Sequence, residues 1–212
     1  MPPRVRALLA LALTWTANLY NFMDGSDGLA GGMAMIGFGA YALAAHFAGA
    51  AALATLSVAL AAAAAAFLTS NFHPARIFMG DVGSVPLGFL AGALGVVGWR
   101  DDLWPLWFPM LVFAPFMCDA TLTLLKRVLR GESASHAHRE HYYQRLVRMG
   151  FGHRGTAYIE YAAMLGCALV ALGARNQRPA VQLGAIAAAT AVLIAVAVWV
   201  DLRWARHVKA AP

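Results

Sequence analysis

The amino-acid sequence predicts an all-α fold, a polytopic bundle of about seven transmembrane helices. Of its 212 residues, 61% are hydrophobic and only 12% are charged, and the mean hydropathy is +0.63. These values lie outside the range of ordinary soluble domains. Apolar runs recur along the whole chain, and most approach the roughly 17–25 residues that cross a bilayer. Because no solenoid-type repeat divides it, we expect residues 1–212 to form a single transmembrane domain.

Each expected helix follows from one apolar run, and the first run is short for a membrane span. Glycine, proline or polar residues separate the runs and favour loops. The alanines at 61–66 give a small-residue face that suits close helix packing, and W-R-D-D-L-W at 99–104 is typical of an interfacial turn with aromatic anchors. The seven runs lie at about 7–20, 30–48, 51–69, 83–98, 105–125, 157–174 and 180–200.

The distribution of positive charge predicts the orientation. Segment 126–155 is a basic, histidine-containing loop, and basic loops favour the cytoplasmic side of a membrane. Counting helices outward places loops 21–29 and 71–81 and the tail 201–212 on the same side, so that 11 of the 16 Lys and Arg residues lie inside. Since such a loop is basic in any case, we expect no nucleic-acid partner. Its basic residues are Lys126, Arg127, Arg130, Arg139, Arg145, Arg148 and Arg154.

The N-terminus does not fit this orientation. The helix count places it outside, yet Arg4 and Arg6 favour the opposite side. A signal peptide would explain the two arginines, but polar residues follow the apolar run almost at once and no small-x-small cleavage site precedes them. We favour the interpretation that the open reading frame has lost upstream helices.

A first polar segment, N-L-Y-N-F-M-D-G-S-D-G-L-A-G, follows the first apolar run. Asn18, Asn21, Asp24 and Asp27 recur every three residues, which on a helix would form one polar stripe. Two neighbouring acids repel each other, and burying either is costly unless a cation or a donor compensates. The pattern therefore indicates a metal or phosphate site. The structural alternative is a helix–loop–helix corner in which Asp27 is the N-cap of the next span.

A second polar segment, N-F-H-P-A-R-I-F-M-G-D-V-G-S, runs from residue 71 to 84. Pro74 ends the preceding helix, and Asp81 then lies at the N-terminus of the next span. A helix N-terminus attracts phosphate, and a carboxylate beside it can bind Mg²⁺. Alternatively, Asp81 is only an N-cap, while His73 and Arg76 lie at the membrane interface with no further role.

A third polar segment, residues 135–154, is rich in histidine and arginine. His136, His138 and His141 raise the question of zinc, but no cysteine accompanies them, because Cys118 and Cys167 fall within predicted spans as small core residues. Neighbouring imidazoles and guanidiniums are better suited to anionic oxygens. A solvated basic loop is the alternative, and Asp119 either joins this cluster or pairs with a neighbour.

The three segments are all predicted at the inner end of the bundle. Carboxylates for a divalent cation, a helix N-terminus and a basic loop together suit a nucleotide diphosphate and a membrane-borne phosphate acceptor. Phosphoryl transfer requires mainly positioning and neutralisation of charge, which these residue types supply. An ion transporter would instead place acids near mid-bilayer, whereas these lie at helix ends.

Three motifs resemble signature segments of one family. They are N-x-x-N-F-M-D-G-x-D-G-L-A, N-F-x-P-A-x-I-F-M-G-D-V-G-S-x-x-L-G-F and A-H-R-x-H-x-Y-Q-R-L. The family is the polyprenyl-phosphate N-acetylhexosamine-1-phosphate transferases, glycosyltransferase family 4, related to phospho-N-acetylmuramoyl-pentapeptide transferase. The resemblance implies transfer of a sugar-1-phosphate from a UDP-N-acetylhexosamine to undecaprenyl phosphate, with release of UMP and a need for Mg²⁺ or Mn²⁺. It also implies a multi-pass protein of the bacterial inner membrane with its active site facing the cytoplasm.

The resemblance also implies roles for individual residues. Asp81 would be the magnesium ligand, Phe78 would stack on the uracil ring, and Asn71 would help to organise the phosphates. Asp24 and Asp27 would face the nucleotide sugar and act in catalysis. The remaining candidates are catalytic His141, which would contact the diphosphate, and the substrate-binding residues Asn18, Asn21, His138, Arg139 and Arg145.

This sequence departs from the family pattern at several positions. Tyr143 and Gln144 replace further histidines, and the resulting pattern resembles members that start O-antigen or exopolysaccharide glycans. Those members belong to lipopolysaccharide or cell-wall biosynthesis. Ser26 replaces a branched apolar residue between the aspartates, which we interpret as a tolerated packing change.

An Asp-Asp pair that family enzymes carry on an earlier cytoplasmic loop has no counterpart before Asn18, and Asp101 and Asp102 lie on the predicted opposite face. The resemblance therefore covers only the C-terminal part of a family member, and we expect a truncated product, a misplaced start codon or half of a split enzyme. The alternative function is a membrane fragment that binds nucleotide sugar and Mg²⁺ without turnover. The possible protein partners are then a second copy of this chain, as a homodimer, or a separate N-terminal part that completes it.

Overall fold

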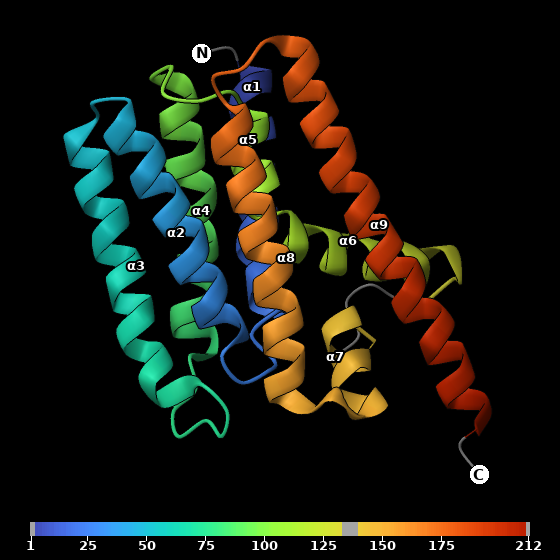
Figure 1. Ribbon diagram of the computed structural model, residues 1–212. Coiled ribbons are helices and arrows are strands. Elements are labelled where there is room, and N and C mark those ends of the chain that lie inside the picture. The colour runs from blue at the N-terminus through green and yellow to red at the C-terminus, as the bar shows by residue number, and fades with distance from the viewer. Residues whose placement is uncertain (1–2, 133–139, 211–212) are drawn as a thin grey trace.

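The computed structural model describes residues 3–132 and 140–210, and this part of the chain is helical apart from its connecting loops, with no strand. The all-α membrane bundle expected from the sequence is confirmed (Figure 1). Its helices are α1 (Pro3–Phe22), α2 (Leu29–Phe47), α3 (Ala51–Asn71), α4 (Gly80–Arg100), α5 (Trp107–Val112), α6 (Ala114–Leu129), α7 (Tyr142–Leu146), the π-helical turn η1 (Val147–Phe151), α8 (Gly152–Ala174) and α9 (Pro179–Ala210).

Helix α2 lies at the centre of the bundle, between α3 and α8 (Figure 1), and α1 packs against α4. Small residues permit these close contacts. A Cβ atom at Gly88 of α4 would lie 2.7 Å from the carbonyl oxygen of Thr16 in α1, so the two backbones approach directly. The buried rings of Phe38 and Tyr41 on α2 pack against the ring of Phe113.

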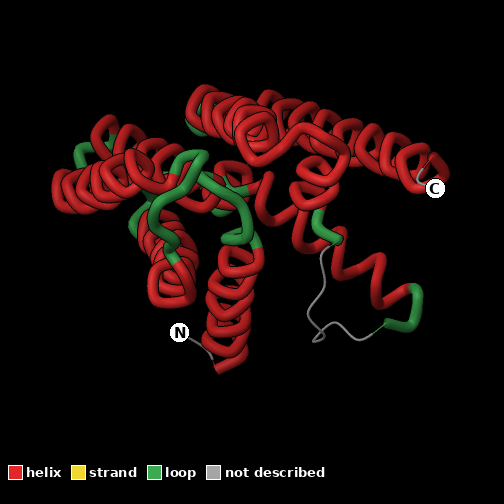
Figure 2. The backbone as a smooth tube through the Cα atoms, turned by 90° about the horizontal axis from the view of Figure 1, so that it is seen from below, coloured by secondary structure: helices red, strands yellow, loops and turns green. Residues whose placement is uncertain are grey.

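Five helical segments of the described chain are long and apolar enough to cross a membrane. The first and fifth of the seven predicted spans, at about 7–20 and 105–125, are not among these five. Residues 105–125 form two helices, α5 and α6, because the chain turns at Phe113 and the Pro115 nitrogen cannot donate to a continuing helix. Figure 2 shows α6 leaving the bundle outward. The five segments are Leu29–Phe47, Ala51–Asn71, Gly80–Arg100, Tyr142–Ala174 and Pro179–Lys209.

The loops 23–28 and 72–79, helix α7 and the end of α9 all lie at the lower end of the bundle in Figure 1. This is the shared end that the helix count predicted for the three polar segments. The turn that contains Asp101 lies at the opposite end, as expected. Helix α9 has 32 residues, or about 48 Å at roughly 1.5 Å per residue, so its last turns extend beyond a hydrocarbon core of about 30 Å.

Candidate active site

The loop at residues 23–28, here called the aspartate loop, is hydrogen-bonded to the loop at residues 72–79. Asp27 Oδ2 accepts from His73 Nδ1 at 2.7 Å and from the backbone N–H of Ala75 at 3.2 Å. Asn71 Oδ1 accepts from the backbone N–H of Gly28 at 3.0 Å, and its amide donates to the carbonyl of Ile77 at 2.9 Å. Asp27 and Asn71 therefore fix the relative position of the two loops, and His73 is more than an interfacial residue.

The N-cap of α2 is Gly28, whose φ of 76° suits glycine, so Asp27 is not the cap of that helix. Partial burial opposes ionisation of Asp27, but the hydrogen bonds from His73 and Ala75 outweigh it and lower the pKa of this carboxyl. Asp27 is thus held as a carboxylate between the two loops.

Asp24 and Asp81 lie close enough for their charges to interact. Asp81 is exposed in the first turn of α4, and Asp24 is partly buried in the aspartate loop. Burial raises the pKa of Asp24 to about 6, the backbone N–H of Gly80 opposes this shift, and the charge of Asp81 adds to it. Two carboxylates that repel each other offer the hard oxygen ligands that Mg²⁺ prefers, so they fit a divalent cation.

Side chains of the described residues do not form a metal centre by themselves. Across residues 3–132 and 140–210, no group of three or more His, Cys, Asp or Glu side chains is placed to hold a metal ion. A cation at Asp81 and Asp24 would therefore complete its shell with water and phosphate oxygens, as Mg²⁺ commonly does.

The polar stripe expected on a single helix is divided between two elements. Helix α1 ends at Phe22, so only Asn18 and Asn21 are helical, and Asp24 and Asp27 lie on the loop. Asn21 Oδ1 accepts from Ser84 Oγ at 2.6 Å, which joins the end of α1 to the start of α4. Asn18 is exposed, and its side chain has no hydrogen bond within the described residues.

Phe78 is exposed at the same end, next to Asp81. Its side chain is 76% exposed, although the ring is large and apolar. An exposed aromatic face beside a carboxylate pair suits stacking on a planar base. The stacking of Phe78 on a uracil ring stays a prediction.

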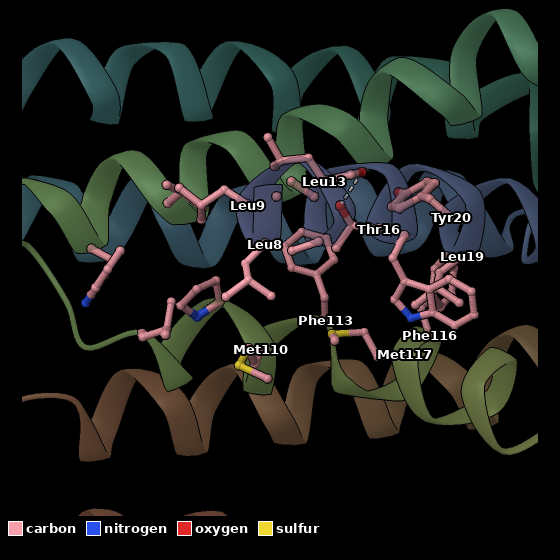
Figure 3. Close-up of a pocket in the computed structure, with 18 of the residues that line it drawn as sticks. Leu8, Leu9, Leu13, Thr16, Leu19, Tyr20, Met110, Phe113, Phe116 and Met117 are labelled. Carbon is pink, nitrogen blue, oxygen red and sulfur yellow. Dashed lines mark hydrogen bonds between the residues drawn. The ribbon is translucent and has the colours of Figure 1, made fainter. Parts of the chain in front are cut away.

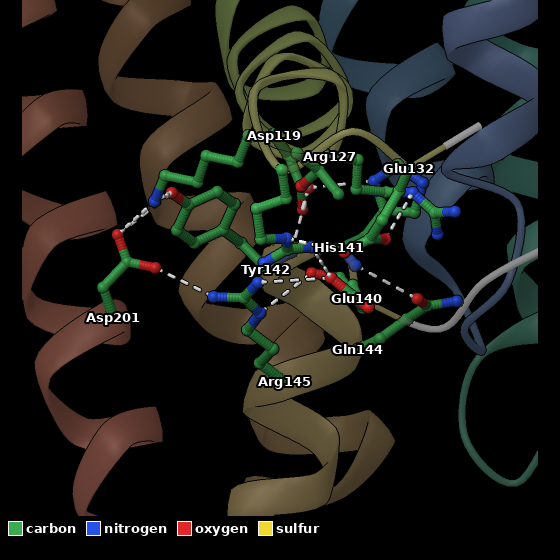
Figure 4. Close-up of polar contacts among 12 residues, drawn as sticks. Asp119, Arg127, Glu132, Glu140, His141, Tyr142, Gln144, Arg145 and Asp201 are labelled. Carbon is green, nitrogen blue, oxygen red and sulfur yellow. Dashed lines mark hydrogen bonds and ion pairs between the residues drawn. The ribbon is translucent and has the colours of Figure 1, made fainter. Parts of the chain in front are cut away.

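His141 lies in a buried polar cluster, which Figure 4 shows. Only 3% of the residue is exposed, and its Nδ1 donates to Asp119 Oδ1 at 3.1 Å. Asp119, which is 5% exposed, also accepts from the backbone N–H groups of Tyr142 and Tyr143, both at 2.9 Å. Because these amides open α7, one carboxylate fixes both the helix and the histidine ring.

The His141 ring also connects this cluster to Phe22, the last residue of α1 before the aspartate loop. It stacks on Phe22, with ring centroids 6.1 Å apart, and on Tyr143 at 5.9 Å. The Tyr143 hydroxyl donates to the carbonyl of Phe22 at 3.2 Å. Gln144 Oε1 accepts from the backbone N–H of His141 at 3.2 Å. Tyr143 and Gln144, which depart from the histidine-rich pattern, thus hold His141 and the aspartate loop together.

Arg145 has intramolecular partners. It is 7% exposed, its Nη1 donates to Asp201 of α9 at 2.8 Å, and its Nε donates to the carbonyl of Glu140 at 2.9 Å. Lys126 of α6 also forms an ion pair with Asp201. The substrate-binding role predicted for Arg145 is not tested by this arrangement, and the predicted residues His138 and Arg139 lie outside the described residues.

Sequence reasoning did not identify the partners that hold the site. The sequence allows two interpretations of Asp119, and it places Asp201 only in the tail 201–212. The sequence feature that marks both residues is an acidic side chain within or beside an apolar helix. Such a side chain needs a hydrogen-bond donor when it is buried. The donors themselves come from distant segments, which no local pattern specifies.

An apolar groove of about 340 Å³ runs between α1, α4, α5 and α6. Figure 3 shows Leu13, Phe113, Phe116 and Met117 along it. At one end lies Tyr20, whose hydroxyl donates to the carbonyl of Ala30 at 2.6 Å, just after the aspartate loop. The groove therefore leads from the apolar body of the bundle toward its polar end.

Fold and site together define a multi-pass membrane protein with carboxylates, a histidine and an exposed aromatic ring gathered at one end of a helix bundle. The model of glycosyl transferase family 4 matches residues 2–99. The chain belongs to glycosyl transferase family 4, and it spans about half the length of the curated relatives that it matches.

Several curated relatives carry informative names. A probable undecaprenyl-phosphate N-acetylglucosaminyl 1-phosphate transferase of Bacillus subtilis is 33% identical over 156 residues, covering 73% of this chain and 44% of the relative. The decaprenyl-phosphate N-acetylglucosaminephosphotransferase of Mycobacterium tuberculosis is 36% identical over 214 residues, covering 86% of this chain and 52% of the relative. The phospho-N-acetylmuramoyl-pentapeptide-transferase of Symbiobacterium thermophilum is 49% identical over 92 residues, covering 42% and 28%.

Proposed function

We propose that this protein transfers an N-acetylhexosamine-1-phosphate from a UDP-sugar to undecaprenyl phosphate, releases UMP and so starts a lipid-linked glycan of the O-antigen or exopolysaccharide type. The observation that carries the proposal is the proximity of the Asp24 and Asp81 carboxylates at the polar end of the bundle. His141 and Tyr143 contact Phe22, directly before the aspartate loop, and so help to position this loop. The names of the relatives support a polyprenyl phosphate acceptor and a hexosamine phosphate donor.

Asp81, with Asp24 opposite, would hold Mg²⁺ or Mn²⁺. When bound, the ion would neutralise charge on the phosphate oxygens during transfer. The protein itself positions the donor, and Phe78 would stack on the uracil ring. The hydrogen bonds of Asn71 and Asp27 fix the loop that contains Phe78 relative to the aspartate loop. Such positioning is the main contribution that phosphoryl transfer asks of a protein.

The acceptor would approach from the bilayer. The apolar groove between α1, α4, α5 and α6 suits a long hydrocarbon chain, because its lining residues are almost entirely apolar and it ends near the aspartate loop. The phosphate of the acceptor would then lie at the polar end of the bundle, level with the carboxylates.

We place the protein in the bacterial plasma membrane with this end toward the cytoplasm. The basic residues of α6, η1 and the end of α9 support this orientation through the positive-inside bias.

The test is release of UMP from a UDP-N-acetylhexosamine in membranes that contain undecaprenyl phosphate. The unsubstituted protein and Asp101→Asn, which changes an exposed acid at the opposite end, should release UMP at equal rates, and Asp81→Asn should lose the activity. Equal, background release by all three would overturn the proposal. Nucleotide-sugar binding that persists without release would support the alternative of a binding fragment without turnover.

A further inference from the structure

Two histidines from distant parts of the chain stack on each other beside the aspartate loop. His73 belongs to the loop at 72–79, and His153 lies in the first turn of α8. Their ring centroids are 5.7 Å apart, and the ring planes differ by only 18°. The side chain of His73 is 41% exposed, and His153 is partly exposed. Both rings are therefore held in place and accessible to a solute.

Each ring is anchored through the same nitrogen. His73 Nδ1 donates to Asp27 Oδ2 at 2.7 Å, and His153 Nδ1 lies 2.9 Å from Ser26 Oγ. Ser26 and Asp27 are adjacent in the aspartate loop. Since Nε2 lies across the imidazole ring from Nδ1, both Nε2 atoms are turned away from this loop. No other hydrogen bond of either ring is found within the described residues.

The charges around the pair favour an anion. A protonated His73 carries hydrogens on both nitrogens, so it can donate to Asp27 and to a ligand at once. The next residue after His153 is Arg154, an exposed cation whose Nε donates to the Tyr158 hydroxyl at 3.3 Å. Among the described groups that contact the pair, Asp27 is the acidic one, and its carboxylate is already engaged by His73 and Ala75.

A metal ion is a poorer fit than an anion. The described residues contain no group of three metal-binding side chains here, and the Asp27 carboxylate is already engaged by His73 and Ala75. Phosphate oxygens, in contrast, accept readily from imidazolium and guanidinium donors.

We propose that His73 and His153 form a phosphate-binding site in which both Nε2 atoms donate to oxygens of one phosphoryl group. The inference rests on the proposed function for its two ligand sources, namely the diphosphate of the nucleotide sugar and the phosphate of the lipid acceptor. It gives Ser26, in place of the apolar residue expected between the aspartates, a definite role as the anchor of His153.

Asparagine substitutions test the site, because the asparagine amide can replace Nδ1 while nothing replaces Nε2. His73→Asn combined with His153→Asn should keep the anchoring contacts and the unfolding temperature. The matched control is His46→Asn, at the far end of α2. We measure calorimetric binding of UDP-N-acetylglucosamine and, separately, the dependence of UMP release on undecaprenyl phosphate concentration.

We expect the double variant to weaken one of these interactions about tenfold or more. Weaker binding of the nucleotide sugar assigns the site to the diphosphate, and a raised KM for undecaprenyl phosphate alone assigns it to the acceptor. If neither changes relative to His46→Asn, the inference is wrong. Weaker nucleotide binding in a protein that never releases UMP would retain the phosphate site and reject the proposed function.

A second measurement avoids substitution of the site. In the unsubstituted protein labelled with ¹⁵N-histidine, inorganic pyrophosphate should shift the Nε2 resonances of His73 and His153 and leave that of His46 unchanged. Unshifted Nε2 resonances at saturating pyrophosphate and at saturating undecaprenyl phosphate would overturn the inference even if the double variant failed to fold.

Discussion

Asp119 shows how a single buried carboxylate organises the site. Its oxygens accept from His141 Nδ1, from Thr123 Oγ1 and from the first two amides of α7. All four donors come to one side chain that is almost completely removed from water. A residue with this many partners determines the position of His141 as much as the backbone does.

Asp119→Ala should therefore destabilise the protein, because it leaves buried donors without a partner, at about 1–3 kcal/mol for each donor that water cannot reach. Asp119→Asn, which keeps the shape and one acceptor oxygen, should cost less. Thermal unfolding in detergent measures both. An unfolding temperature for Asp119→Ala equal to that of the unsubstituted protein would contradict this role.

Gly25 is a position where the aspartate loop closely approaches Tyr143 of α7. A Cβ atom there would overlap the Tyr143 hydroxyl, and the Tyr143 ring cannot swing away because it is buried against His141. Gly25→Ala should lower both the unfolding temperature and the rate of UMP release. Adding Tyr143→Phe removes the hydroxyl and should restore part of both losses. Additive losses in the double variant would show that this contact is not the cause.

Asp27 makes the stability of the folded protein depend on pH in a definite direction. Its pKa is lower in the folded protein than the ordinary value of 3.8, so its contribution to stability is complete above that value and is lost as the pH falls through the folded pKa. Compared with Asp27→Asn, the unsubstituted protein should be more stable at pH 5, and the difference should shrink toward pH 3. A difference that is constant over this range would refute the assignment.

At the scale of elements, α9 stabilises the site from a distance. Asp201 near its end pairs with Lys126 of α6 and with Arg145 of α7, and Tyr142 donates to it at 3.2 Å. A helix read from the sequence as only the last span therefore also connects α6 and α7.

Asp201→Asn should destabilise the protein by roughly 1 kcal/mol, since the carboxylate is partly exposed and solvent screens the pairs. It should also loosen α7, which hydrogen–deuterium exchange of residues 142–146 would detect. The control is Asp101→Asn, whose partner Arg100 is an exposed neighbour and whose loss should leave both measurements unchanged. Equal effects of the two substitutions would remove the special role of α9.

The helices also show which structural features local sequence patterns predict and which they do not. Apolar runs and prolines were sufficient to predict most of the long helices, because hydrophobic length and missing N–H groups act locally. They did not predict α7 and η1, which lie in the segment expected to be a loop. They were insufficient at 105–125, where a run of adequate length is divided at Phe113. Packing decides whether such a run continues straight, and packing depends on α1 and α8, which lie far away in the sequence.

At the scale of the whole molecule, the sequence predicted that three polar segments share one end of the bundle, and the structure confirms this shared end (Figure 1). That prediction rests on the number of basic residues in each loop and on the alternating direction of successive membrane spans. The pairs Asp27 with His73, His141 with Asp119 and His73 with His153 could not be predicted in this way. Each depends on the exact height and rotation of two helices, which periodicity does not specify.

The central claim is that these segments form one pocket in which Asp24 and Asp81 bind a phosphate ligand through a divalent cation. Calorimetric titration of UMP in the presence of Mg²⁺ tests it most directly. The unsubstituted protein and Asp101→Asn should bind UMP, EDTA should abolish binding, and Asp24→Asn and Asp81→Asn should each weaken it about tenfold or more, that is by roughly 1.4 kcal/mol. Binding that is unchanged by EDTA and by both substitutions would contradict the claim.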